Sequence, residues 1–293
     1  MAAGMVKSTA ILAAMQRGGF YDRVLAGGAE LDRVKAYLRS LASPVPAARA
    51  DPLQYPTYPL FPGLRHQPWH DASGYAAAAQ LEAASTLIRD EYAALADADL
   101  VHYEPPAMDR LWAVYMLWHM GVEVDAAPSR CPRTCALLRA LPRVCLAYPW
   151  GDALFSVHAA DSHLRAHCSV DNLRLRLHLA LEVPDGCAIR VGTQTRRWQP
   201  GRVLAFEDSF EHEVWNRGRE RRAILIVDLW HPDLTALEIE VLSAGFCQSQ
   251  VRQLFLQQRV AMLSGDHPQL LRRLADGMAA QDEDAAVSRW WGR

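Results

Sequence analysis

Residues 155–231 read FSVHAADSHLRAHCSVDNLRLRLHLALEVPDGCAIRVGTQTRRWQPGRVLAFEDSFEHEVWNRGRERRAILIVDLWH. Leucine recurs at every second position from Leu173 to Leu181, and Arg174, Arg176 and His178 stand between these leucines. Side chains of a β-strand point alternately to its two faces. The alternation therefore predicts a strand with one apolar face and one cationic face.

Turn signals divide this stretch into several short runs of strand-forming residues. These signals are Asp185-Gly186, Pro200-Gly201 and Asn216-Arg217-Gly218. His167 and His212 each lie near the end of a β-rich run. Short strands separated by such turns predict a mainly β core with flanking helices, arranged as a small β-sandwich or a jelly-roll, cupin-like barrel with a polar mouth.

The composition is that of a folded globular protein. The chain has 293 residues, of which 51% are hydrophobic and 22% charged, and its net charge is -2. So little charge gives no strong attraction to a polyanion, and we expect no nucleic-acid partner. The apolar runs are shorter than the ~20 residues of a membrane span. The N-terminal apolar stretch is also short for a signal peptide and lacks a convincing cleavage site.

Six scattered cysteines favour reduced thiols and a cytoplasmic location. Cys131 and Cys135 have a spacing found in zinc sites, but no second pair of ligands follows at zinc-finger distance. We therefore interpret them as buried thiols near a helix. The alanine- and arginine-rich composition favours a bacterial source.

We interpret residues 1–293 as one catalytic domain with three parts. Residues 1–145 are predicted to be largely helical, 146–235 to form the jelly-roll core, and 236–293 to be a C-terminal helical extension. No repeat or low-complexity linker divides the chain. A proline-rich segment, 43–63, is predicted to cross the front part in extended form.

Helices are predicted from apolar periodicity and composition. In the front part they cover 5–41, 74–97, 107–119 and 133–141. The segment 107–119 contains aromatic residues at roughly helical spacing, which favours packing on the sheet over an aromatic ligand platform. Beyond the core, three more helical patterns follow, and the end of the chain, with Trp290 and Trp291, is predicted to be frayed or lightly docked.

His167 and His212 are candidate metal ligands. Two imidazoles that project from different strands into one barrel mouth can bind a divalent first-row metal, and non-haem iron oxygenases combine two histidines with one carboxylate. Here the first histidine is followed by Cys168 and Ser169, so the expected carboxylate is missing. Spacing alone also allows hydrogen-bonded core or surface histidines.

Cationic residues near the predicted mouth suggest an anionic ligand. Arg174 and Arg176 share a strand face with His178, and Arg221 or Arg222 begins the last β run. A buried arginine is costly unless an anion pairs with it. The arginines could pair with acids at the rim or clamp a dicarboxylate, and a metal beside a dicarboxylate suggests 2-oxoglutarate as cosubstrate.

The core sequence resembles the aspartyl/asparaginyl β-hydroxylases, which are Fe(II)- and 2-oxoglutarate-dependent oxygenases. The resemblance is carried by SVDNLRLRLHLALEVPDG, by SFEHEVW and by VDLWHP, and it extends over about residues 55–235, including YPLFPGLRHQPWHD and CPRTCALL. It implies a double-stranded β-helix fold. The tetratricopeptide-like region and membrane anchor of the animal enzymes have no counterpart in this sequence.

The resemblance also implies a role for each matched residue. His167 and His212 match the iron ligands. Ser156 and Arg222 match the residues that hold the distal carboxylate of 2-oxoglutarate, and Arg176 and His178 match those at the end next to the keto group. Asp208 matches an acid that steadies iron-bound water.

Ser169 stands where the animal enzymes have glycine, at the position of the missing carboxylate. This serine could hydrogen-bond a bound water or stay away from iron. Because two-histidine iron also serves 2-oxoglutarate-dependent halogenases, halogenation or desaturation remains an alternative on the same scaffold.

The implied reaction hydroxylates an unactivated C–H bond with O2 and releases succinate and CO2. The substrate is expected to be an amino acid, a peptide or a natural-product intermediate, possibly with an acidic group. Several arginines could attract that group or be ordinary surface charges: Arg165, Arg174, Arg190 and Arg196. A different class of function, a non-catalytic jelly-roll module that binds an acidic ligand, is the other alternative.

Overall fold

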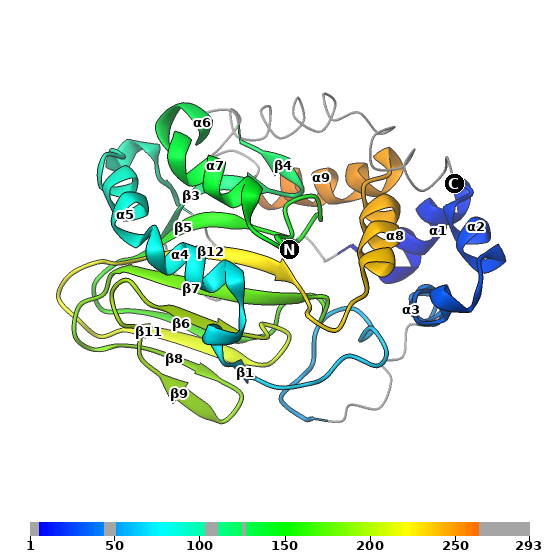
Figure 1. Ribbon diagram of the computed structural model, residues 1–293, viewed down its shortest axis with the longest axis horizontal. Helices are drawn as coiled ribbons and strands as arrows, with labels where there is room; N and C mark the ends of the chain where they lie inside the picture. The colour runs from blue at the N-terminus through cyan, green and yellow to red at the C-terminus, as the bar shows by residue number, and fades with distance from the viewer. Residues whose placement is uncertain (1–5, 44–50, 103–110, 125–126, 264–293) are drawn as a thin grey trace.

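The computed structural model describes residues 6–43, 51–102, 111–124 and 127–263, with side chains described as far as residue 258 in the last helix. Two antiparallel sheets face each other, and helices lie over the larger sheet and at one end of the molecule (Figure 1). The larger sheet has the order β1-β10-β7-β12-β5-β3-β2, with β4 paired to β3, and the smaller has the order β6-β11-β8-β9. This is the predicted jelly-roll class of fold.

The strands of the larger sheet come from both halves of the described chain. They are β1 (Trp69–His70), β2 (Val101–His102), β3 (Trp112–His119), β4 (Val122–Glu123), β5 (Ala153–His158), β7 (Arg174–Glu182), β10 (Val203–Phe206) and β12 (Arg222–Trp230). The smaller sheet consists of β6 (Ser162–His167), β8 (Cys187–Val191), β9 (Gln194–Arg196) and β11 (His212–Asn216).

Helices pack outside the sheets. They are α1 (Ser8–Arg17), α2 (Phe20–Ala26), α3 (Asp32–Ser40), α4 (Ala76–Ala83), α5 (Ser85–Ala93), α6 (Ala127–Arg130), α7 (Pro132–Ala140), α8 (Ala236–Phe246) and α9 (Ser249–Leu263). Short 3-10 turns lie at Ala29–Leu31, Ala72–Gly74 and Asp97–Asp99. No helix in the described ranges combines the length and apolarity that crossing a membrane requires.

The alternation in β7 places its two faces in different surroundings. Its leucines join one core with apolar residues of α4, α5 and α7, which cover this face of the larger sheet (Figure 1). The opposite face of the larger sheet packs with the smaller sheet in a second core, which includes Ala180, Leu164 and Val214. The cationic side chains of β7 therefore point into the space between the sheets.

The helix predicted at 107–119 is wrong for its described part, because Trp112–His119 forms strand β3. Seven of its eight residues are buried, so the segment is apolar on both faces. A strand covered on both sides has a nearly continuous apolar run, which periodicity cannot distinguish from a buried helix. The front part is thus less helical than predicted, since it supplies β1 to β4.

Other predicted helices agree more closely with the structure. The helix predicted at 74–97 is divided at Ala84 into α4, which packs on the larger sheet, and α5, which also contacts α7. Phe61 in the proline-rich segment is fully buried, whereas Leu60 is partly buried. The predictions for the last helical pattern and for Trp290 and Trp291 lie outside the described residues.

Candidate active site

His167 and His212 lie side by side at the edge of the smaller sheet. They are Cα partners across β6 and β11, and their ring centroids are 4.1 Å apart. His167 Nδ1 lies 2.8 Å from the carbonyl oxygen of Arg165, and His212 Nδ1 lies 2.9 Å from that of Phe210. A carbonyl can only accept, so each Nδ1 carries the proton.

A neutral imidazole with its proton on Nδ1 has a lone pair on Nε2. Burial lowers the pKa of both histidines, in the case of His212 to about 3, so both are neutral at neutral pH. The histidine pair therefore has the tautomer and charge state that a metal ligand needs, with each ring oriented by a backbone carbonyl.

Arg222 is buried between the sheets in a group of side chains that offers few hydrogen-bond acceptors. Its side chain is 1% exposed, and its Nε and Nη1 atoms have no hydrogen-bond partner among the described residues. Nη2 donates a long hydrogen bond of 3.4 Å to Ser156 Oγ, and the guanidinium lies 4.7 Å from the centre of the Trp198 ring. Burial lowers the Arg222 pKa to about 10.

His178 and Trp198 belong to the same group of buried side chains as Arg222. Their rings are stacked with centroids 6.1 Å apart, and neither nitrogen of His178 nor Nε1 of Trp198 has a hydrogen-bond partner among the described residues. Buried polar groups are normally hydrogen-bonded. A cation and several donors without acceptors therefore indicate a pocket built for an anionic ligand.

Arg174 and Arg176 differ from Arg222 because both have acidic partners. Asp228 accepts a hydrogen bond of 2.9 Å from Arg174 and two of 2.8 Å from Arg176. Asp208 lies 3.3 Å from Arg176 and 3.6 Å from Arg174. Burial opposes ionisation of Asp208, but the two arginines outweigh it and lower the pKa of this carboxyl group.

Further carboxylates complete this cluster around the two arginines. Asp171 lies 3.5 Å from Arg174, and Asp152 lies 3.8 Å from Arg176. His119 Nδ1 is 2.8 Å from the Asp152 carboxylate. Four carboxylates around two guanidiniums give an acidic cluster, which reaches the histidine pair through Asp208.

Ser169 belongs to this cluster. Its hydroxyl accepts a hydrogen bond of 2.6 Å from Arg174, and its backbone N–H donates to the carbonyl oxygen of Asp208. The hydroxyl oxygen thus accepts from Arg174, and its O–H helps to lower the pKa of Asp208 as a side-chain donor. The structure places the serine beside the predicted acid, without a carboxylate in the position next to His167.

The arginines predicted as possible substrate contacts lie in four different surroundings. Arg174 is buried in the cluster just described. Arg190 pairs with Glu211 and Glu213 on the smaller sheet. Arg165 is exposed, and the exposed Arg196 stacks 4.4 Å above the Trp69 ring. Arg174 is therefore no surface charge that could attract a substrate.

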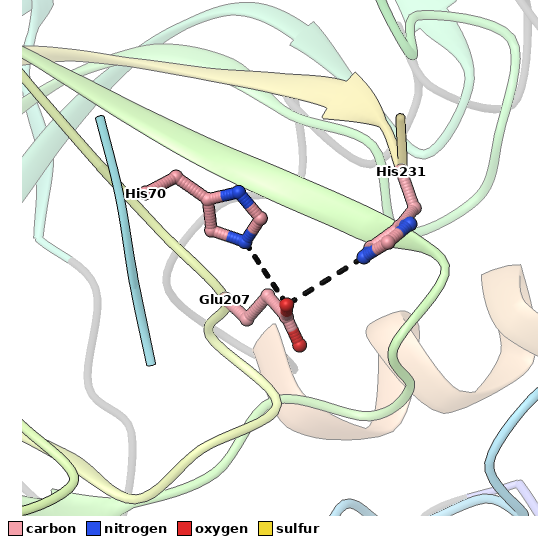
Figure 2. A group of neighbouring side chains, drawn as sticks. All are labelled: His70, Glu207 and His231. Atoms are coloured by element: carbon pink, nitrogen blue, oxygen red, sulfur yellow. Dashed lines mark hydrogen bonds and ion pairs between the residues drawn. The ribbon is translucent and has the colours of Figure 1, made fainter. Parts of the chain in front are cut away.

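A second group of histidines surrounds Glu207, which follows β10 directly and precedes Asp208. His70 Nε2 is 3.0 Å and His231 Nε2 is 3.5 Å from one carboxylate oxygen of Glu207, and all three residues are buried (Figure 2). Two histidines and a carboxylate are also a common iron-binding set. The sequence analysis did not single out this group.

The tautomer of His231 argues against a metal at Glu207. The backbone N–H of Asp233 donates to His231 Nδ1 over 3.1 Å, so Nδ1 has no proton and a neutral ring carries it on Nε2, facing Glu207. Burial opposes ionisation of Glu207, but the contacts of both histidines outweigh it and lower the pKa of this carboxyl group. The group is best described as a buried carboxylate that is hydrogen-bonded to His70 Nε2 and lies beside the His231 ring.

Cys131 and Cys135 are buried free thiols at the start of α7 and within it. Burial raises the pKa of each to about 12, which opposes the thiolate form that zinc binds. Among the described residues, no cluster of metal-ligating groups includes them. Their surroundings agree with the predicted buried thiols.

Sequence reasoning missed several residues of this region. Asp228 had a visible signal, because it is the one acid in the apolar run of β12 and a buried acid needs a partner. His158 follows Ser156 by two positions on β5 and therefore shares its face. Trp198 had no signal, since it lies between β9 and β10 and reaches the pocket only in the folded chain.

Comparisons with known proteins agree with the resemblance seen in the sequence. The model of the family described as Aspartyl/Asparaginyl beta-hydroxylase matches residues 82–232, which include every predicted site residue. The ornithine lipid ester-linked acyl 2-hydroxylase of Rhizobium tropici is 32% identical over 219 residues, covering 71% of this chain and 74% of that protein. The chain belongs to the aspartyl/asparaginyl beta-hydroxylase family.

Human aspartyl/asparaginyl beta-hydroxylase is 38% identical over 181 residues. The match covers 59% of this chain but only 24% of the human protein. Among solved structures, KdgF from Halomonas sp. matches 48% of this chain and 97% of its own, with 10% identity and a TM-score of 0.29. The cupin domain of Schizosaccharomyces pombe Cnp3 matches 44% and 74%, with 12% identity and a TM-score of 0.28.

Proposed function

We propose that the chain is an Fe(II)- and 2-oxoglutarate-dependent oxygenase that hydroxylates an unactivated C–H bond. The observation that carries this proposal is Arg222. It is a buried guanidinium without a carboxylate partner among the described residues, while Arg174 and Arg176 nearby are paired with acids. A buried cation of this kind is costly unless a ligand brings the anion.

The residues of the histidine pair fit a divalent metal. His167 and His212 are held in the tautomer that leaves Nε2 free, and the acidic cluster next to them has more carboxylates than guanidiniums. When bound, iron together with 2-oxoglutarate supplies the oxidation of the C–H bond, with succinate and CO2 as coproducts. The protein then has to bind, orient and shield the reactants.

Each side chain has a defined task in this proposal. Arg222 and Ser156 hold the distal carboxylate of the cosubstrate, and His178 contacts its 2-oxo acid end. Arg176, which its ion pairs with Asp228 and Asp208 hold in place, contacts the same end of the cosubstrate. Asp208, fixed as a carboxylate by the two arginines, orients a water at the metal, and the apolar core around the pocket excludes bulk solvent.

The activities for which two relatives are named share one chemical feature, which suggests the substrate class. The β-carbon of an aspartyl or asparaginyl residue is bonded to the side-chain carboxyl or amide carbon, and C2 of an acyl chain is bonded to the acyl carbonyl carbon. We extend this feature to the present chain. Its substrate is an amino acid, peptide or acyl compound that is oxidised at a carbon next to a carbonyl group.

An anaerobic titration of the apoprotein tests the proposal. Fe(II) and 2-oxoglutarate are added, the visible charge-transfer band of their chelate is recorded, and O2 is then admitted while succinate is assayed with candidate acidic amino acids, peptides and acyl compounds. We expect the band with the wild type and none with His212→Ala. A folded wild-type protein without the band would favour the non-catalytic binding module instead.

A further inference from the structure

His158 lies directly across from Arg222 on the neighbouring strand and has no assigned role. It is the last residue of β5 and the Cα partner of both Arg222 on β12 and Trp112 on β3. Its side chain is 2% exposed, and its ring centroid is 5.8 Å from that of Trp112. Nδ1 of His158 has no hydrogen-bond partner among the described residues.

The position of His158 on the strand directs it towards the pocket. Ser156 precedes it by two residues, so both side chains lie on the face of β5 that points between the sheets. The charge of Arg222 lowers the pKa of both His158 and His178. The histidine is therefore close to the groups that line the proposed carboxylate site.

The charge state of His158 suits a hydrogen-bond donor. Burial, together with the positive charge of Arg222, lowers its pKa well below the usual range, so the ring is neutral. A neutral imidazole keeps one N–H donor and does not repel the neighbouring guanidinium. An apolar side chain would fill this place without leaving a buried polar nitrogen unsatisfied, so packing alone does not account for a histidine.

We propose that His158 is a further ligand of the acidic cosubstrate, donating an N–H to the distal carboxylate that Arg222 and Ser156 hold. The inference rests on the proposed function and adds a specificity-determining residue to it. With three donor groups from adjacent strands around one end of the pocket, a 2-oxo acid with a second carboxylate is selected over one with an apolar tail.

Binding measured without turnover tests this role. The protein is loaded with Mn(II), and the Kd values of 2-oxoglutarate and of 2-oxopentanoate, which has a methyl group in place of the distal carboxylate, are determined by calorimetry. His158→Met removes the donor at similar volume. His158→Asn and His158→Gln keep an amide N–H near the positions of Nδ1 and Nε2. Val157→Ala, on the opposite face of β5, is the control.

Because a hydrogen bond to a charged group is lost, we expect His158→Met to raise the Kd of 2-oxoglutarate about tenfold or more. The Kd of 2-oxopentanoate should stay within about twofold, since it has no partner for the donor. At least one amide variant should restore most of the affinity, and Val157→Ala should leave the ratio of the two Kd values unchanged.

Two results would overturn the inference while leaving the proposed function intact. One is an unchanged Kd for 2-oxoglutarate in a folded His158→Met protein. The other is an equal loss for both ligands with no rescue by either amide, which would indicate a packing role. A folded wild-type protein that binds neither 2-oxo acid would overturn the proposed function itself.

Discussion

Replacing Arg222 by methionine should make the protein more stable in the absence of ligand, although it removes a central residue of the proposed site. Burial lowers the pKa of this guanidinium from 12.5 to about 10. At 1.36 kcal/mol per unit, this corresponds to a cost of roughly 3 kcal/mol to the folded state. Because the folded-state pKa is below the unfolded one, the cost is fully present below about pH 10 and fades as the pH rises towards 12.5.

Removing the charge abolishes this cost, but part of the resulting gain in stability is offset because favourable contacts of the side chain are lost. The contact of Arg222 with the Trp198 ring contributes about 1 kcal/mol, and imperfect packing of methionine costs about 1 kcal/mol more. A net stabilisation of about 1 to 2 kcal/mol remains. In a protein of this size it raises Tm by roughly 2 to 6 °C.

The assay is thermal unfolding at pH 7.5 with Mn(II), with and without 2-oxoglutarate. At a 2-oxoglutarate concentration of one hundred times Kd, the free energy of unfolding of the wild type rises by about 2.7 kcal/mol. For Arg222→Met it should hardly change. Arg221→Met is the matched control, because Arg221 is 45% exposed and pairs with Asp97. Arg221→Met should change the free energy of unfolding by no more than about 0.5 kcal/mol. A ligand-free Arg222→Met protein that melts several degrees below the wild type would refute the argument that this guanidinium lacks an internal counter-ion.

Three more substitutions test the rest of the site. His212→Ala should abolish metal binding and succinate formation while the far-ultraviolet circular dichroism stays unchanged; full turnover would exclude this residue as a ligand. Asp228→Asn removes the carboxylate that accepts three hydrogen bonds from Arg174 and Arg176. It should destabilise the protein by about 3 to 5 kcal/mol in urea unfolding, and a loss below 1 kcal/mol would contradict the ion pairs. His231→Ala should cost about 1 to 3 kcal/mol by removing the imidazole that lies 3.5 Å from Glu207, with metal content unchanged in atomic absorption, whereas a lost metal equivalent would make the Glu207 group a metal site.

The sequence predicted the parts of the fold in which local pattern and tertiary environment agree. Alternation in β7 indicated both the strand and its polar face, because a sheet with helices on one side and a second sheet on the other gives its two faces different surroundings. The same reasoning failed at β3. Both faces of this strand are buried, so the segment lacks the polar positions that would have revealed its period.

The site was predictable as a set of residues but not as a network of contacts. His167, His212 and Arg222 could be chosen from the sequence through the resemblance. The pairing of Arg174 and Arg176 with acids could not, since Asp152 and Asp171 precede β5 and β7 while Asp228 lies within β12, and these acids meet only in the folded chain. For this reason Arg174 seemed available to a substrate in the sequence, whereas it is fully engaged in the folded chain.

The two histidine groups differ in a physical property that decides whether a neutral imidazole can bind a metal. By residue type, His70, Glu207 and His231 are the better iron-binding set, because they include the carboxylate that the pair at His167 and His212 lacks. The hydrogen bond made by Nδ1 of each histidine instead favours His167 and His212 as the metal-binding pair. A carbonyl acceptor fixes the proton of His167 and His212 on Nδ1 and frees Nε2, while the backbone N–H of Asp233 forces the proton of His231 onto Nε2. The acceptor or donor beside Nδ1, supplied by the backbone, decides which imidazole can bind a metal.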